Sequence, residues 1–202
     1  MHLQLGSGRL LALLRGLEKR SNYASFLADL HKAKTVAQGY ESYMAWKSSP
    51  SIIASDGFSG CIGLIIAGRG GVIMGHYSNT NTDIARAQRE IPKLISANTA
   101  SFAGGKAYLF AQVKLRSPTT YVSEPNNLKL EAIVKDNLGL STQRVKYIEP
   151  EDMMVDDDDE LLDDCPEELL YGAMMVKHPG GAGAWEAIFV DMAMQKTAAA
   201  NS

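Results

Sequence analysis

The sequence predicts an α+β protein with a mixed, largely antiparallel β-sheet or sandwich core and helices packed outside it. Apolar residues recur at intervals of three and four along the chain up to about Ser48, which is typical of amphipathic helices. Short β-rich apolar runs begin at Ser51, and two more stand near the C-terminus. Further helical patterns lie between these runs. This order of elements favours a layered α+β fold with one main core.

Residues 1–48 are expected to form an N-terminal helical segment packed on the core, which ends at Ser49-Pro50-Ser51. Its first residues briefly resemble a signal peptide, but Arg9 and Arg15 interrupt the apolar part and no small-residue cleavage site follows. We therefore expect a cytoplasmic protein, or one delivered to a host cell by a route without a classical signal peptide.

Residues 49–195 are expected to form the main α+β domain, and a hairpin stands at its centre. Apolar runs cover 61–67 and 72–77, and the glycine-rich stretch between them at 68–71 is a credible tight turn. The elements expected after the hairpin are a helix over 81–102 capped by Asn81 or Thr82, a strand over 106–115, a helix over 126–140 closed by Gly139, a strand over 144–150, and a strand pair over 169–179 and 185–194. Residues 196–202 are expected to be a frayed tail.

Charge and hydropathy narrow the possible functions. The 202 residues carry 20 basic and 23 acidic side chains, a net charge of −3, which gives no general attraction to nucleic acid. The longest uncharged apolar run, Cys61 to Gly68, is far shorter than the roughly 18–20 residues that span a bilayer. Acidity is concentrated in residues 149–168, which we interpret as a solvated, self-repelling loop. We expect no nucleic-acid partner and no membrane span.

The two cysteines stand in different settings. Cys165 lies in the acidic loop, where neighbouring carboxylates should suppress its reactivity. Cys61 begins the first hairpin strand and His76 ends the second, so counting from the turn makes them cross-strand neighbours. A neutral imidazole beside a thiol can take its proton and release the nucleophilic thiolate. The alternative is a buried structural cysteine, which is common in apolar strands.

The stretch Phe58-Ser59-Gly60-Cys61, followed fifteen residues later by His76, resembles the signature of cysteine-dependent glutamine deamidases. That family includes the catalytic domain of cytotoxic necrotizing factors, Burkholderia lethal factor 1 and the chemotaxis deamidase CheD. The toxins have leucine where this chain has Phe58. The resemblance covers residues 51 to about 113.

The resemblance implies a reaction and its residues. Cys61 would attack the side-chain carboxamide of a protein glutamine, and His76 would move the protons, so that glutamate is left. The family orients its histidine through a third acceptor, for which Ser55 is the first candidate and Ile53 the second. The resemblance implies a protein substrate and no metal or organic cofactor.

The sequence is also compatible with two other functions. A different cysteine hydrolase, such as a peptidase or amidase, would use the same pair of residues. A non-catalytic interaction module would merely pack Cys61 and His76, and would bind its partner through the N-terminal helix or the acidic loop.

Overall fold

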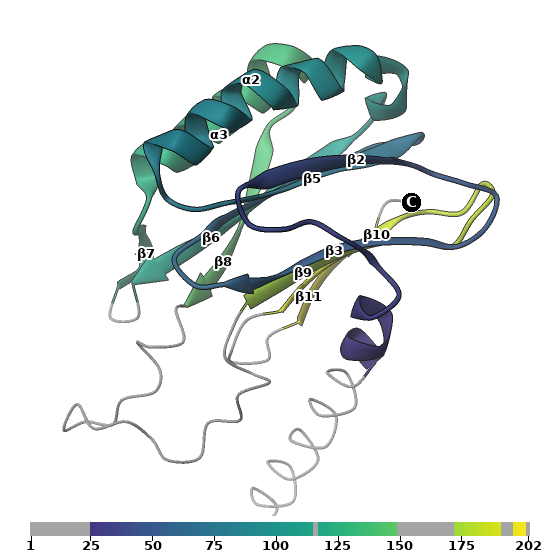
Figure 1. The fold of residues 1–202 in the computed structure, drawn as a ribbon, viewed down its shortest axis with the longest axis horizontal. Helices are drawn as coiled ribbons and strands as arrows, with labels where there is room; N and C mark the ends of the chain where they lie inside the picture. Colours follow the sequence, from purple (N-terminus) through teal and green to yellow (C-terminus); the bar gives the residue numbers. More distant parts are fainter. Residues whose placement is uncertain (1–24, 115–116, 149–171, 191–195, 201–202) are drawn as a thin grey trace, which may run out of the picture.

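The computed structural model describes residues 25–114, 117–148, 172–190 and 196–200 (Figure 1). Two β-sheets face each other, and two helices cover the outer side of one of them. This arrangement is the predicted α+β class, with a largely antiparallel sandwich at its centre. Among the described helices, none has the length and apolar character needed to cross a membrane.

The first sheet has five strands, in the order β1 (Lys34–Thr35), β3 (Ser51–Phe58), β9 (Gly172–His178), β10 (Glu186–Val190) and β11 (Lys196–Ala200). Its pairs are antiparallel except β1 with β3. The pairing of β3 with β9 shifts register between Ser55 and Phe58, which marks a bulge at this point of β3. Ser55 and Phe58 flank this bulge.

The second sheet has six strands. β2 (Tyr40–Ala45), β5 (Gly71–Tyr77), β4 (Ile62–Ala67) and β6 (Lys106–Lys114) follow one another, and β6 pairs further with β7 (Ser117–Tyr121) and with β8 (Thr142–Ile148). The predicted hairpin is confirmed: β4 and β5 are antiparallel and joined at the glycine-rich turn. All side chains of both strands are buried, because the sheet is covered on its two faces.

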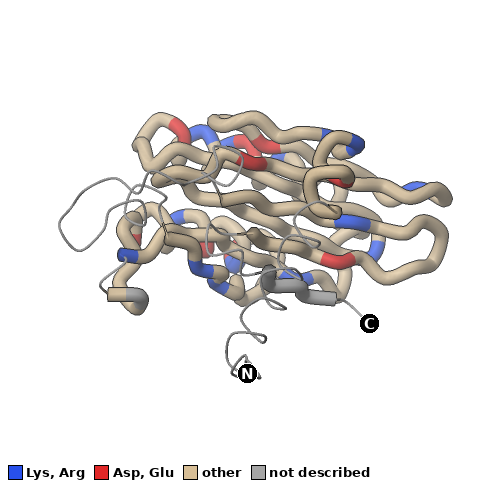
Figure 2. Tube along the Cα trace, turned by 90° about the horizontal axis from the view of Figure 1, so that it is seen from below, with Lys and Arg blue, Asp and Glu red and all other residues tan. Residues whose placement is uncertain are grey.

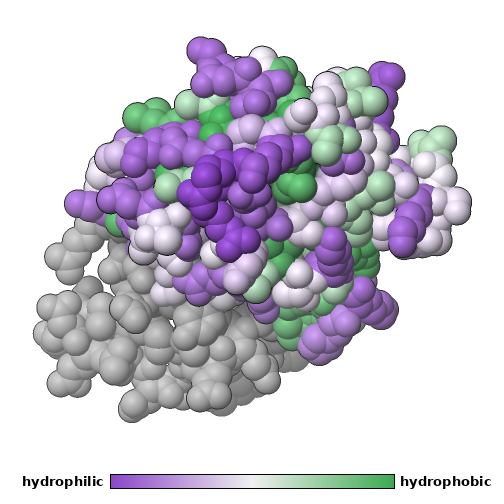
Figure 3. Space-filling view, turned by 45° about the horizontal axis from the view of Figure 1, so that its top comes forward, coloured by the Kyte–Doolittle hydropathy of each residue, from purple (hydrophilic) through white to green (hydrophobic). Residues whose placement is uncertain are grey.

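The helices α2 (Asn81–Ala97) and α3 (Glu124–Leu138) pack on the outer face of this second sheet. The buried residues of α2 follow helical spacing: Ile84, Ala87, Ile91 and Ile95. Its N-cap is Thr80, whose side chain accepts from the Asp83 backbone amide, rather than the predicted Asn81 or Thr82. α3 ends at Gly139, as predicted, with a left-handed φ of 67°. The face that the helices turn to solvent is mostly hydrophilic, with small apolar patches between the polar side chains (Figure 3).

Three apolar clusters fill the layers, and the smallest packs Phe26 against β3, β9 and β10 of the first sheet. Of the other two, one lies between the sheets and contains Cys61, Phe58 and Tyr147, whereas the other lies between the second sheet and the helices. Alternate residues of β4 and β5 point to the two clusters, so Ile65 and Met74 face the other sheet while Ile62 and Ile73 face the helices. Charged residues of both signs are interspersed along the described chain (Figure 2).

Two expectations about the ends of the chain are wrong. A helix occupies residues 25–30, but the chain then forms β1 and β2 instead of continuing as helix to Ser48. These strands complete the edges of the two sheets, and backbone pairing there outweighs the local helical periodicity. The expected frayed tail instead supplies β11, which pairs with β10 along Lys196–Ala200. Residues 1–24 and the acidic loop lie outside the described residues.

Candidate active site

Cys61 and His76 lie on the same face of the second sheet, but they are not directly opposite each other. The register pairs His76 with Gly63, so Cys61, two residues earlier, is the diagonal neighbour of the histidine. The direct pairing predicted from the sequence is wrong by two residues, because the turn closes with Gly68 N donating to Gly71 O and so sets the register. Diagonal neighbours in a sheet lie about 7–8 Å apart at Cα, within reach of longer side chains.

Both side chains are removed from solvent. Cys61 is 4% exposed and His76 is 2% exposed. Tyr147 on β8 donates from its hydroxyl to the backbone carbonyl of Cys61, and the Cys61 thiol donates to Ser59 O over 3.6 Å. The position of the cysteine at the start of β4 is therefore held by its backbone as well as by its side chain.

Ser55 reaches the imidazole from the opposite sheet. Its Oγ lies 2.9 Å from His76 Nδ1 and donates to the backbone carbonyl of Val36 over 2.6 Å. A serine hydroxyl has one proton, and here that proton is directed to Val36 O. Ser55 Oγ must therefore accept from Nδ1–H, so that the neutral imidazole carries its proton on Nδ1 and a lone pair on Nε2. Of the two sequence candidates for the orienting residue, the structure brings Ser55 to the ring.

His76 Nε2 is buried and has no hydrogen-bond partner among the described residues. Leaving a buried polar atom without a partner costs about 1–3 kcal/mol. Five other buried side-chain atoms of the described residues, in Ser123, Asn127, Thr142 and Trp185, are also without a partner, so the open nitrogen gains its meaning from its position near Cys61. Burial lowers the pKa of His76 from 6.5 to about 4, and the charge of Asp83 opposes this only in part. The ring is consequently neutral near pH 7 and able to accept a proton at Nε2.

Phe58 fixes the plane of the imidazole. Its ring stacks on that of His76 with centroids 3.9 Å apart and planes 15° apart, and it is fully buried. Met174 and Phe58 together explain why glycine occupies position 63: a Cβ there would lie 2.6 Å from Met174 Sδ and 3.0 Å from Phe58 Cε1. Phe58 is the one residue of the motif that differs from the toxin pattern, and its ring supplies much of the apolar surface around the histidine.

Gln38 is a site residue that the sequence did not reveal. Its Nε2 donates to Cys61 Sγ over 3.4 Å and to Ser78 Oγ over 2.8 Å. Ser78 in turn donates from its backbone amide to Asp83 Oδ2 over 2.9 Å. Gln38 lies in the turn between β1 and β2, a region predicted to be helical, and no motif distinguishes it from the other glutamines.

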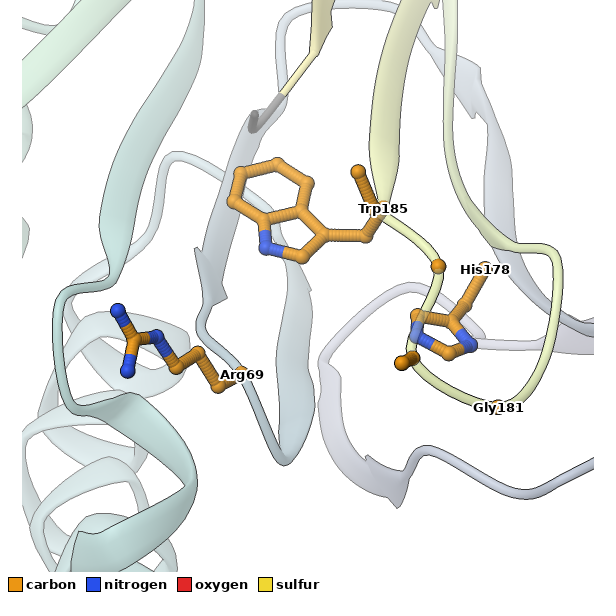
Figure 4. Close-up of a pocket in the computed structure, with 7 residues that line it drawn as sticks. Arg69, His178, Gly181 and Trp185 are labelled. Carbon is orange, nitrogen blue, oxygen red and sulfur yellow. The ribbon is translucent and has the colours of Figure 1, made fainter.

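A separate cavity of about 330 Å³ lies at the other end of the sandwich (Figure 4). It is bounded by Arg69 in the hairpin turn, His178 and Trp185 at the ends of β9 and β10, and the glycine-rich loop between those strands. Arg69 follows β4, whereas Cys61 precedes it, so the length of that strand separates the cavity from the cysteine and histidine. The cavity is therefore no part of the site built around Cys61.

Metal binding finds no support within the described ranges, where no three His, Cys, Asp or Glu side chains gather in a way that could hold an ion. The acidic residues 149–168 and Cys165 lie outside those ranges. The chemical capacity of the site thus rests on a thiol, a neutral imidazole with an open Nε2, and an amide donor at the sulfur.

No protein-family model matches the chain, and no curated protein matches its sequence significantly.

Proposed function

We propose that the chain is a cysteine-dependent protein-glutamine deamidase, in which Cys61 is the nucleophile, His76 the general base and acid, and Ser55 the residue that orients the histidine. One observation carries the proposal: the hydrogen-bond chain from His76 through Ser55 to Val36 leaves Nε2 as an unpartnered acceptor on the face of the sheet that also bears Cys61. A catalytic base needs this tautomer and this open position.

The arrangement supports catalysis better than it supports packing alone. One ring nitrogen of His76 is hydrogen-bonded to Ser55, and the other is buried without a partner, which leaves it available to accept a proton. Burial lowers the pKa of the imidazole, the carboxylate of Asp83 partly opposes this shift, and the ring of Phe58 stacks on the imidazole. Perturbed pKa values combined with a specific hydrogen-bond arrangement are typical of functional sites.

In the proposed reaction, His76 Nε2 takes the thiol proton as Cys61 Sγ bonds to the carboxamide carbon of a substrate glutamine. The tetrahedral intermediate collapses, its C–N bond breaks, and His76 returns the proton to the departing nitrogen, which leaves as ammonia. Water then attacks the thioester while Nε2 takes one of its protons. The C–S bond breaks, the thiol regains its proton, and the former glutamine of the substrate is left as glutamate.

The choice of a glutamine in a protein, rather than another amide, comes from the resemblance of Phe58-Ser59-Gly60-Cys61 and His76 to the deamidase signature. A neutral imidazole fits an uncharged carboxamide substrate, because the resting site then holds no ion pair that an uncharged group would have to displace.

The first test measures the reactivity of the thiol. The full chain is treated with iodoacetamide between pH 5 and pH 9, and the labelled cysteines are identified by peptide mass spectrometry in the wild type and in His76→Gln. Cys61 should be labelled quickly in the wild type and at least about tenfold more slowly in the variant, while labelling of Cys165 should not depend on His76. Slow labelling of Cys61 that is independent of His76 would refute the proposal.

The second test identifies the reaction. Unfolded casein and a mixture of native cytoplasmic proteins are incubated with the wild type and with Cys61→Ser. Glutamines that gain about 1 Da, together with ammonia release and no new chain termini, identify deamidation. New termini without that mass gain would identify a peptidase instead. Cys165→Ser serves as the matched control and should behave as the wild type.

A further inference from the structure

The turn between β1 and β2 contacts all three residues of the proposed site. Val36 O accepts from Ser55 Oγ, Gly39 N donates to His76 O over 2.7 Å, and Gln38 Nε2 donates to Cys61 Sγ. Tyr40 N donates to Ala37 O over 3.2 Å, which closes a β-turn with Gln38 and Gly39 at its centre. Gly39 has a φ of 81°, as a turn of this kind requires, so the direction in which Gln38 leaves the backbone is set by the turn.

The side-chain amide of Gln38 is held in one orientation. A carboxamide nitrogen has two protons, and here one is directed to Ser78 Oγ and the other to Cys61 Sγ. The bond to Ser78 is the shorter, at 2.8 Å, and Ser78 is itself anchored through its backbone amide to Asp83. One amide proton therefore anchors the group while the other points at the sulfur.

We propose that Gln38 is a further catalytic residue of this site, and that its Nε2–H binds the oxyanion that forms when Cys61 attacks a carbonyl carbon. The inference rests on the proposed function, because it needs Cys61 to act as the nucleophile. It concerns the oxygen of the substrate, to which His76 and Ser55 contribute nothing.

The geometry fits this role. In the tetrahedral intermediate the carbon is bonded both to Sγ and to the oxyanion, so the oxyanion lies roughly 2.7 Å from the sulfur, and useful donors lie about 2.7–3.1 Å from the oxyanion. A donor 3.4 Å from Sγ that already points at the sulfur needs only a small rotation to reach it. Gln38 is exposed while the thiol is buried, so the amide stands on the side from which a substrate must approach.

The test compares two reactions of the same thiol. Acylation of Cys61 by p-nitrophenyl acetate passes through a tetrahedral oxyanion, whereas alkylation by iodoacetamide does not. The substitution Gln38→Met keeps the approximate size of the side chain and removes the donor. The ratio of the acylation rate to the alkylation rate should fall by about 10²-fold in this variant. Loss of the bond from Nε2–H to Sγ also lowers the thiolate population, but that change slows both reactions alike and cancels in the ratio.

Matched variants complete the experiment. Gln88→Met alters an exposed glutamine on α2 and should leave both rates unchanged. Ser78→Ala removes the anchor of the amide but keeps the donor, so the ratio should fall by a smaller factor than in Gln38→Met.

Each remaining outcome overturns a stated claim. An unchanged ratio in Gln38→Met would overturn the role of Gln38 and leave the proposed function intact. Faster alkylation and faster acylation together would mean that Gln38 only covers the thiol, and would likewise overturn its role. A wild-type Cys61 that reacts with neither reagent would overturn the proposed function itself.

Discussion

Ser55 Oγ and His76 Nδ1 are hydrogen-bonded at 2.9 Å although the two residues belong to different sheets of the sandwich. Together with the bond from Ser55 Oγ to Val36 O, this contact determines which nitrogen of the imidazole carries its proton, and it links the geometry of the site to the packing of the core.

Replacing Ser55 by alanine should slow the reaction of Cys61. Without the acceptor at Nδ1 the ring can adopt either tautomer and either orientation, so the fraction of molecules with an unprotonated Nε2 falls. We expect iodoacetamide labelling of Cys61 at pH 7 to be at least about tenfold slower in Ser55→Ala. Ser96→Ala, an exposed serine on α2, is the control. A labelling rate equal to that of the control would mean that the hydroxyl does not orient the ring.

The buried imidazole should make folding stability depend on pH. The folded pKa of about 4 lies below the ordinary value of 6.5, so between these values the unfolded state binds more protons than the folded state. The contribution of His76 to the free energy of unfolding is fully present above pH 6.5. It is lost as the pH falls towards 4, by up to about 3 kcal/mol.

Urea unfolding between pH 4 and pH 8 tests this dependence through the difference between the wild type and His76→Gln. The variant should lose less stability in the stated window, because carboxylate titration is common to both proteins and cancels. If the stabilities of the two proteins changed with pH in parallel, the low pKa of His76 would be contradicted.

Phe58→Leu introduces the residue that the toxin motif has at this position, and it removes the stacked ring. Loss of buried volume should cost about 1–2 kcal/mol of stability. Since burial is the main cause of the low pKa of His76, the pKa should rise from about 4 towards 6.5. NMR titration of the imidazole C–H signals measures it. Phe189→Leu, another buried phenylalanine of the same cluster, should lose similar stability without moving the pKa of His76.

Gly63→Ala should destabilise the protein by about 1–3 kcal/mol, because the new methyl group would collide with Met174 and Phe58. The clash with Met174 is the closer, at 2.6 Å from Sδ. In a Met174→Ala background the same substitution should therefore cost less, and a double-mutant cycle from thermal unfolding measures the difference. Additive effects would show that the Met174 side chain moves aside without any loss of stability, so that the clash does not cause the destabilisation.

The hairpin and the helices could be predicted from the sequence because their signals are local. Glycines at 68–71 mark the turn, and the spacing of Ile84, Ala87 and Ile91 marks a helix face. The strands β1 and β2 could not be predicted, since they depend on partners far along the chain: β1 pairs with β3, and β2 with β5. Edge pairing is a tertiary effect that local periodicity does not encode.

In the candidate site, too, the residues placed by local sequence signals could be predicted, and those placed by tertiary packing could not. Cys61 and His76 could be placed near each other because one turn joins their strands, although His76 lies opposite Gly63 instead of Cys61. Ser55 was chosen only through the family resemblance, and its contact with His76 depends on how the two sheets pack. Gln38 carried no signal, because its role depends on a turn within a region that was expected to be helical.

The division of the site between two sheets also governs when the thiol can be reactive. His76 is fixed in its basic form only while β3 lies against β5, so a chain whose second sheet has formed alone would carry an unoriented ring beside Cys61. A newly made or heat-damaged copy would then hold an ordinary cysteine. Under the proposed function, only a molecule with a completed sandwich would modify other proteins.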